Sequence, residues 1–194
     1  MQIFEERLAD IFAYNNSKTA KTAAAELSKR YNGFSSLAQA DYEPLCELCG
    51  SSNAVLIRLI ASLASRRVTD SFKFGREHSE EEVIEFLKAL FLSVTKETVF
   101  ALPIDSRGRI ISAEILGEGT VNSAGILPRR IIEIMLKNKS SRVIIAHNHP
   151  NGEAEPSRED VYATAKMLEV FAQSGKELVC HYIVAGNNVK RVEM

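Results

Sequence analysis

The sequence predicts an α/β protein in which a mixed β-sheet is flanked by helices and preceded by a small, all-helical N-terminal domain. Two observations support this fold class. Residues 1–70 are rich in Ala, Leu and Ser, and their apolar residues recur at helical spacing with few strand-like runs. After about residue 70, short apolar runs typical of strands alternate with stretches of helical periodicity. The length of 194 residues fits one domain or two small ones.

The composition is that of an ordinary globular protein. Apolar residues make up 45% and charged residues 25% of the chain, and the net charge of -1 gives no basic field that would indicate nucleic acid or an anionic membrane. No apolar run reaches the roughly 20 residues of a membrane span, and the N-terminus does not read as a signal peptide. Three cysteines are an odd count, which does not indicate a disulfide framework. We therefore expect a cytoplasmic protein without a membrane partner.

The N-terminal part is expected to form a helical domain over residues 1–70. Residues 19–31 and 53–67 show helical spacing of their apolar side chains. Eight basic and eight acidic residues balance within 1–70, so no charged face dominates. The mostly polar residues 69–78 are the candidate linker to a second domain over residues 72–194.

The second domain is expected to alternate strands and helices. Ser79 and Glu82 fit a capping box that opens a helix. Pro128 suits the first turn of another helix, and Ser157 is the natural N-cap of a long one that ends near residue 174. The expected strands are residues 97–104, 110–116, 143–146, 177–184 and 189–192, with turn residues at 105–108 and 186–188.

Two histidines, His147 and His149, directly follow the apolar run of residues 143–146. Positions i and i+2 of an extended chain point to one face, so His147 and His149 can meet one ion at about 2.0–2.1 Å. Pro150 and the residues after it bend the chain away. The helix that begins at Ser157 can then bring Asp160 back as a third ligand.

Two histidines and one carboxylate leave a tetrahedral zinc ion with an open position, as in catalytic zinc sites. Such an ion polarises a carbonyl and acidifies water, and the chemistry then requires a carboxylate that acts as a general base. A second interpretation of the same residues stays open: Asp160 lies three residues after Ser157, so the two could form only a capping box.

The full string from His147 to Asp160 resembles a known motif. Its pattern H-x-H-x(10)-D, ending in Pro-Ser-x-x-Asp, is similar to the JAMM (MPN-plus) metalloprotease motif. In its detail it resembles the bacterial RadC family, with Asn151 where that family usually has Ser. Further RadC-like pieces occur in order at Gly119-Thr120-Val121-Asn122, Pro128-Arg129 and residues 181–186. The resemblance covers residues 72–194 and implies a JAMM/MPN fold with a cytidine-deaminase-like layout.

The resemblance also implies roles for two more residues. It places the general base at Glu97, at the start of the first strand, and it gives Ser157 a part in supporting the oxyanion or the metal-bound water. Glu114 and Glu118 compete with Glu97 by composition alone. The implied activity is zinc-dependent hydrolysis of an amide bond, by a metallopeptidase or an isopeptidase-like enzyme that holds one Zn²⁺ and acts on a protein or peptide.

Residues 1–70 resemble the RadC N-terminal region more weakly. Tyr31-Asn32-Gly33-Phe34 and residues 45–54 are similar to its helix-hairpin-helix segment, in which a Gly-x-Gly turn offers N–H groups to a DNA phosphate. Gly50 matches the second glycine, but Leu48 replaces the first. A degenerate motif in a charge-balanced segment favours a helical packing module, with weak DNA association at most.

Two other functions stay open at this point. The RadC family carries a DNA-repair label, so a non-catalytic adaptor in DNA repair or recombination is one alternative. A metal-dependent nuclease that uses the same ligands is the other. His-Asn-His is also the name of a nuclease class, but that class spreads its residues over a ββα unit, so we interpret the match as coincidence.

The remaining cysteines and histidine have structural interpretations. Cys46 and Cys49 form a C-x-x-C without the second pair that a structural zinc site needs, so core or surface thiols are expected. Cys180 lies in an apolar run and is expected in the core. His181 is expected to be a buried, hydrogen-bonded core histidine, with contact to the metal ligands as the alternative.

Overall fold

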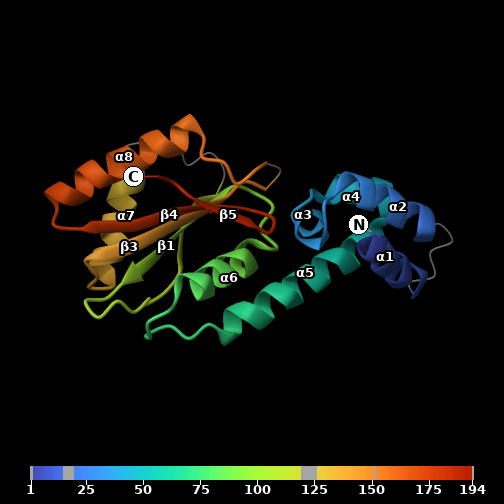
Figure 1. Cartoon of the computed structure of the whole chain (residues 1–194), viewed down its shortest axis with the longest axis horizontal. Helices are drawn as coiled ribbons and strands as arrows, with labels where there is room; N and C mark the ends of the chain where they lie inside the picture. Colours follow the sequence, from blue (N-terminus) through green and yellow to red (C-terminus); the bar gives the residue numbers. More distant parts are fainter. Residues whose placement is uncertain (1, 15–19, 119–125, 151, 194) are drawn as a thin grey trace.

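The computed structural model describes residues 2–14, 20–118, 126–150 and 152–193 and confirms the predicted α/β class (Figure 1). Five helices come first: α1 (Gln2–Tyr14), α2 (Ala20–Arg30), α3 (Phe34–Ala38), α4 (Tyr42–Cys49) and α5 (Ser51–Ser71). The sheet region follows, with α6 (Glu80–Phe91), β1 (Thr98–Ile104), β2 (Glu114–Glu118), α7 (Ile126–Lys137), β3 (Arg142–Asn148), α8 (Arg158–Gln173), β4 (Glu177–Ala185) and β5 (Asn188–Arg191). Within this described part of the chain, no helix combines the length and apolar character that crossing a bilayer needs.

The sheet is mixed and has the strand order β2-β1-β3-β4-β5. β3 pairs antiparallel with β1 and parallel with β4. A parallel pair needs a crossover connection, and α8 supplies it. The register sets Val99 of β1 and Ile183 of β4 on either side of His147, so the end of β3 is flanked by strands on both sides.

Helices cover the two faces of the sheet differently (Figure 1). α6 packs on one face, where it meets Ile144 and Ala146 of β3. α7 and α8 cover the other face, where they meet Val143 and Ile145. Because side chains alternate along a strand, His147 points to the α7 and α8 face together with Val143 and Ile145.

Two predicted boundaries differ from the observed ones by more than two residues. The second strand begins at Glu114 rather than at residue 110, because the turn at Asp105 is followed by only one isolated bridge, between Ile104 and Ile110. The predicted linker 69–78 begins as the last turn of α5. Its remainder is packed, with Phe72 stacked on His78 at a centroid distance of 3.9 Å. The segment Gly119-Thr120-Val121-Asn122 lies outside the described residues.

The N-terminal helices have a core of their own and also contact the sheet region. Leu8, Phe12, Leu27 and Leu45 are buried in the core of α1 to α5. Figure 1 shows α5 running from these helices to α6. Gln39, only 1% exposed, joins the two regions. Its Nε2 donates to the carbonyl of Phe91 at 3.0 Å, and its Oε1 accepts from the N–H of Gly186 at 3.2 Å.

Replacing Gln39 with Leu should therefore destabilise the whole chain. The substitution leaves the N–H of Gly186 without its Gln39 acceptor and the carbonyl of Phe91 with only the N–H of Val94, and an orphaned buried group costs about 1–3 kcal/mol. We expect urea denaturation to show a free energy of unfolding lower by about 1–3 kcal/mol. Ser35→Ala removes an exposed hydrogen bond to Asn187 at the same contact and is the control, with an expected change within about 0.5 kcal/mol.

Candidate metal centre

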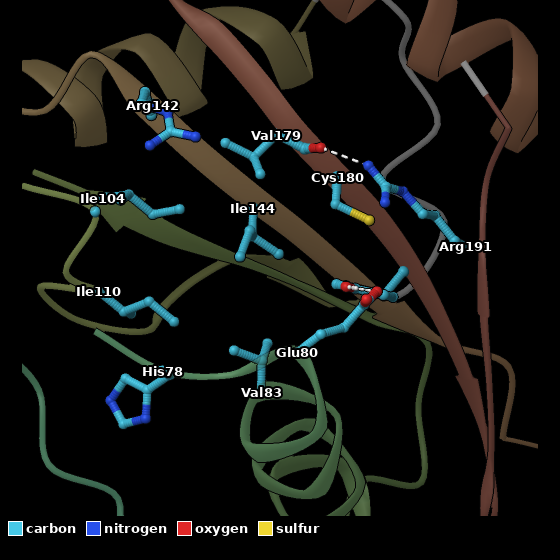
Figure 2. Close-up of a pocket in the computed structure, with 12 residues that line it drawn as sticks. His78, Glu80, Val83, Ile104, Ile110, Arg142, Ile144, Val179, Cys180 and Arg191 are labelled. Carbon is cyan, nitrogen blue, oxygen red and sulfur yellow. Dashed lines mark hydrogen bonds between the residues drawn. The ribbon is translucent and has the colours of Figure 1, made fainter. Parts of the chain in front are cut away.

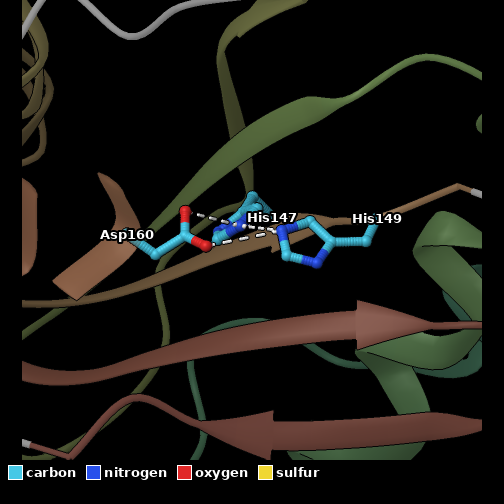
Figure 3. A group of neighbouring side chains, drawn as sticks. All are labelled: His147, His149 and Asp160. Atoms are coloured by element: carbon cyan, nitrogen blue, oxygen red, sulfur yellow. Dashed lines mark hydrogen bonds and ion pairs between the residues drawn. The ribbon is translucent and has the colours of Figure 1, made fainter. Parts of the chain in front are cut away.

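The structure brings His147, His149 and Asp160 together, as the spacing predicted (Figure 3). The two Nε2 atoms lie 3.0 Å apart, and the carboxylate of Asp160 lies 3.1 Å from Nε2 of His147 and 3.5 Å from Nε2 of His149. Bonds of 2.0–2.1 Å at tetrahedral angles set neighbouring ligand atoms about 3.3 Å apart. The three side chains therefore have the spacing of ligands around one ion and could hold a metal.

The backbone around β3 explains how both histidines reach the same place. His147 is the next-to-last residue of β3 and lies on its α8 face. His149 continues the extended path because its N–H donates to the carbonyl of Val184 at 2.9 Å. The chain then turns, with the N–H of Gly152 donating to the carbonyl of His149. A Cβ on residue 152 would lie 3.3 Å from the Cβ of His149, so glycine permits this close turn.

The hydrogen bond of His149 fixes which of its nitrogens can bind an ion. Its Nδ1 lies 3.0 Å from the carbonyl oxygen of Glu153. A carbonyl oxygen only accepts, so Nδ1 carries the proton and donates. Nε2 then keeps its lone pair and faces His147 and Asp160.

Asp160 takes part in the capping box and also faces the two histidines. Ser157 and Asp160 form a capping box at the start of α8, in which Oδ2 accepts from the N–H of Ser157 at 2.8 Å and from its hydroxyl at 2.6 Å. Oδ1 is turned toward His147. Burial raises the pKa of Asp160, but the hydrogen bond and charge of His147 and the two donors of Ser157 outweigh it and hold that pKa below its usual range. The carboxylate is therefore ionised, as a metal ligand must be.

Replacing Ser157 with Ala tests the capping role separately. The change removes the N-cap and one of the two donors to Asp160, so the free energy of unfolding of the metal-free protein should fall by about 0.5–2 kcal/mol. Chemical denaturation measures it. Ser157→Thr keeps the hydroxyl and should recover most of the loss; an equal loss in both variants would contradict the capping role.

A second, fully buried layer lies behind His147. Nδ1 of His147 is 2.9 Å from Nε2 of His181, and Nδ1 of His181 is 2.7 Å from the hydroxyl of Thr164. Burial and the nearby charge of His147 lower the pKa of His181 to about 3, so its ring is neutral. The predicted buried, hydrogen-bonded histidine is thus in direct contact with a candidate ligand. Sequence reasoning missed Thr164, although it lies one helical turn after Asp160 on α8.

Glu97 immediately precedes β1 at the same end of the sheet. Val99, two residues later, pairs with His147, so alternation places Glu97 on the face of the candidate ligands. Asn148, completely buried between the two histidines, fixes this segment. Its Oδ1 accepts from the N–H of Thr98 at 2.8 Å, and its Nδ2 donates to the carbonyl of Lys96 at 3.2 Å. The backbone on both sides of Glu97 is therefore tied to β3, while a catalytic role for Glu97 stays a prediction.

The two competing glutamates have other surroundings. Glu114 accepts hydrogen bonds from Lys137, Asn138 and Ser112, which lower its pKa and occupy both carboxylate oxygens. Glu118 pairs in register with Thr98 at the end of β2, and its side chain lies outside the described residues. The hydrogen bonds of Glu114 therefore favour Glu97 over Glu114 as the candidate base.

Two cavities flank this region. One of about 280 Å³ lies on the α6 face, where Glu80 and Val83 of α6 face Ile144 and Cys180 across it (Figure 2). It is on the opposite face of the sheet from the three candidate ligands. A second, of about 530 Å³, borders the loop that follows His149 and is lined by Pro150, Gly152 and Glu153, by the turn at residues 185–188 and by residues of α2 and α3.

The thiols have the structural surroundings that the sequence indicated. Cys180 is buried beneath α6, and Cys49 is buried in the helical core. Burial raises the pKa of Cys49 to about 11, with a smaller contribution from Cys46. A thiol held protonated is a poor metal ligand, so these residues do not compete with the histidine cluster.

Comparison with known proteins gives a consistent result. Residues 77–191 match the family described as RadC-like JAB domain. The chain is 33% identical over 174 residues to a UPF0758 protein of Dechloromonas aromatica (strain RCB), which covers 88% of this chain and 77% of that protein. It is 30% identical over 179 residues to a UPF0758 protein of Thioalkalivibrio sulfidiphilus (strain HL-EbGR7), covering 91% and 80%.

Proposed function

The chain belongs to the RadC family of JAB-domain proteins, and from this premise we propose that it is a zinc-dependent hydrolase of amide bonds, a metallopeptidase or isopeptidase. The JAB-domain family includes metalloisopeptidases. The observation that carries the proposal is the cluster of His147, His149 and Asp160, whose spacing fits one tetrahedral ion with a fourth position left for substrate or water.

The donor set favours zinc over the commoner hard cations. Two neutral imidazole nitrogens and a single carboxylate suit zinc, whereas Mg²⁺ and Ca²⁺ prefer oxygen ligands. A zinc ion held by His147, His149 and Asp160 would supply Lewis acidity to the scissile carbonyl and lower the pKa of an attacking water.

The remaining steps belong to side chains of the chain. Glu97 would take the proton from the attacking water and deliver it to the leaving amine. Ser157 would support the oxyanion with its hydroxyl. In the structure that hydroxyl donates to Asp160 Oδ2, so its proton would have to turn from the carboxylate to the oxyanion as negative charge develops.

The neighbouring cavity supports a protein or peptide as the substrate. The cavity of about 530 Å³ beside His149 is lined by hydroxyl and amide side chains, among them Ser35, Ser36, Asn187 and Asn188. Such groups can hydrogen-bond the amides of an extended peptide. Its position between the N-terminal helices and the loop after His149 would hold that peptide next to the proposed zinc ion.

Hydrolysis by the full chain tests the proposal. The zinc-loaded protein and a chelator-treated sample are incubated with a peptide library that includes isopeptide-linked lysines, and new amines are detected by mass spectrometry. Cleavage that requires zinc is expected. Stoichiometric zinc binding without cleavage of any library member would contradict hydrolase activity. Parallel incubation with DNA separates the alternatives, since strand cleavage would support a nuclease and salt-dependent binding alone an adaptor.

A further inference from the structure

A buried row of hydrogen bonds runs from the backbone carbonyl of Asp160 through Thr164 and His181 to His147. It starts at a carbonyl oxygen, which can only accept. The hydroxyl of Thr164 lies 2.7 Å from the backbone carbonyl oxygen of Asp160, one turn earlier in α8. A carbonyl oxygen has no proton, so the hydroxyl proton of Thr164 must point to it. The oxygen of that hydroxyl then has only lone pairs to offer to other partners.

The next group must therefore donate to Thr164. Nδ1 of His181 lies 2.7 Å from the hydroxyl oxygen, and it must carry a proton to make this contact. The ring of His181 is only 3% exposed, and its two nitrogens contact the uncharged hydroxyl of Thr164 and the ring of His147, so a charge on it would be buried without an anionic partner. A neutral ring with its proton on Nδ1 has a bare Nε2, which accepts a hydrogen bond.

His147 is the last member of the row. Its Nδ1 lies 2.9 Å from the bare Nε2 of His181 and must donate. We propose that Thr164 and His181 are positioning residues that hold the ring proton of His147 on Nδ1 and so leave Nε2 as its metal-binding atom. This inference rests on the proposed zinc site. Nε2 is the atom that lies 3.0 Å from His149 and 3.1 Å from Asp160.

The two histidine ligands thus reach the same tautomer by different routes. His149 donates directly to the backbone carbonyl of Glu153. His147 is 3% exposed and is held through the side chains of His181 on β4 and Thr164 on α8 instead. The row of hydrogen bonds begins at the backbone carbonyl of Asp160 and ends at His147. These two candidate ligands are therefore connected twice, by the contact of their side chains at the site and by the row behind it.

The test measures zinc affinity by competition with a chromogenic chelator, in the full chain. Thr164→Val keeps the shape of the side chain and removes the hydroxyl, and we expect zinc to bind about 10- to 100-fold more weakly. Thr164→Ser keeps the hydroxyl and should bind zinc as the wild type does. Long-range ¹H–¹⁵N correlation of the zinc-loaded wild type should show the His147 proton on Nδ1 with Nε2 bound. Circular dichroism and denaturation of each metal-free variant show whether the fold is retained.

The outcomes separate the two proposals. A wild type that does not bind zinc contradicts the proposed function itself. A wild type that binds zinc, with Thr164→Val binding equally well, overturns only the positioning role. A His147 proton found on Nε2 in the loaded protein overturns it as well, whatever the affinity.

Discussion

Replacing Glu97 with Gln is expected to reduce amide hydrolysis by about 10²- to 10⁴-fold, the usual contribution of a general base. Gln has nearly the same shape but cannot take a proton from water. Glu97 precedes β1 on the same face as His147, and Asn148 ties the residues on both sides of it to β3. It is not one of the three candidate ligands, so zinc affinity should stay at the wild-type value.

A loss of turnover without a loss of zinc affinity is the result that identifies a general base. Turnover is measured on a peptide found in the library experiment, and zinc affinity by chelator competition. Glu133→Gln changes an exposed glutamate of α7 and should leave both unchanged. Full turnover by the Glu97→Gln protein would remove Glu97 from the mechanism.

Replacing Asp160 with Asn is expected to abolish stabilisation by zinc. An ion that binds only the folded state adds about 2.7 kcal/mol to the free energy of unfolding when its free concentration is 100 times the dissociation constant. The Asn side chain can still accept from Ser157 at the helix N-terminus, so the metal-free variant should fold. It lacks the negative charge between His147 and His149, and zinc should therefore no longer raise its unfolding temperature.

The control variant changes the neighbouring carboxylate, Glu159, to its amide. Glu159→Gln removes an exposed carboxylate from the first turn of α8, and this variant should be stabilised by zinc as the wild type is. Equal stabilisation of the Asp160→Asn protein would contradict the site, because zinc would then have to bind elsewhere in the protein.

The candidate ligands could be predicted because residues close together in the sequence indicate them. Two histidines at i and i+2 after an apolar run share a face whatever the rest of the fold. Ser157 and Asp160 identify the start of α8, since a capping box occupies consecutive positions of the chain. Both signals are local, so neither depends on knowing which strands pair.

The supporting residues could not be predicted because they depend on pairing across the sheet. No sequence pattern indicates the role of Asn148, which depends on the strand register that places it opposite the residues around Glu97. Thr164 and His181 meet only because α8 crosses over to the strand beside β3. Periodicity also predicts a helix without saying how it packs. Ile57 of α5 is buried, whereas Leu59 and Leu63 of the same stripe are 52% and 60% exposed.

X-ray absorption at the zinc edge, on the full chain loaded with one equivalent of zinc, tests the central claim most directly. A site made by His147, His149 and Asp160 predicts nitrogen and oxygen neighbours only, at about 2.0–2.1 Å, with the outer-shell scattering of two imidazole rings. A sulfur shell at about 2.3 Å, or fewer than two imidazoles, would contradict the proposed metal centre.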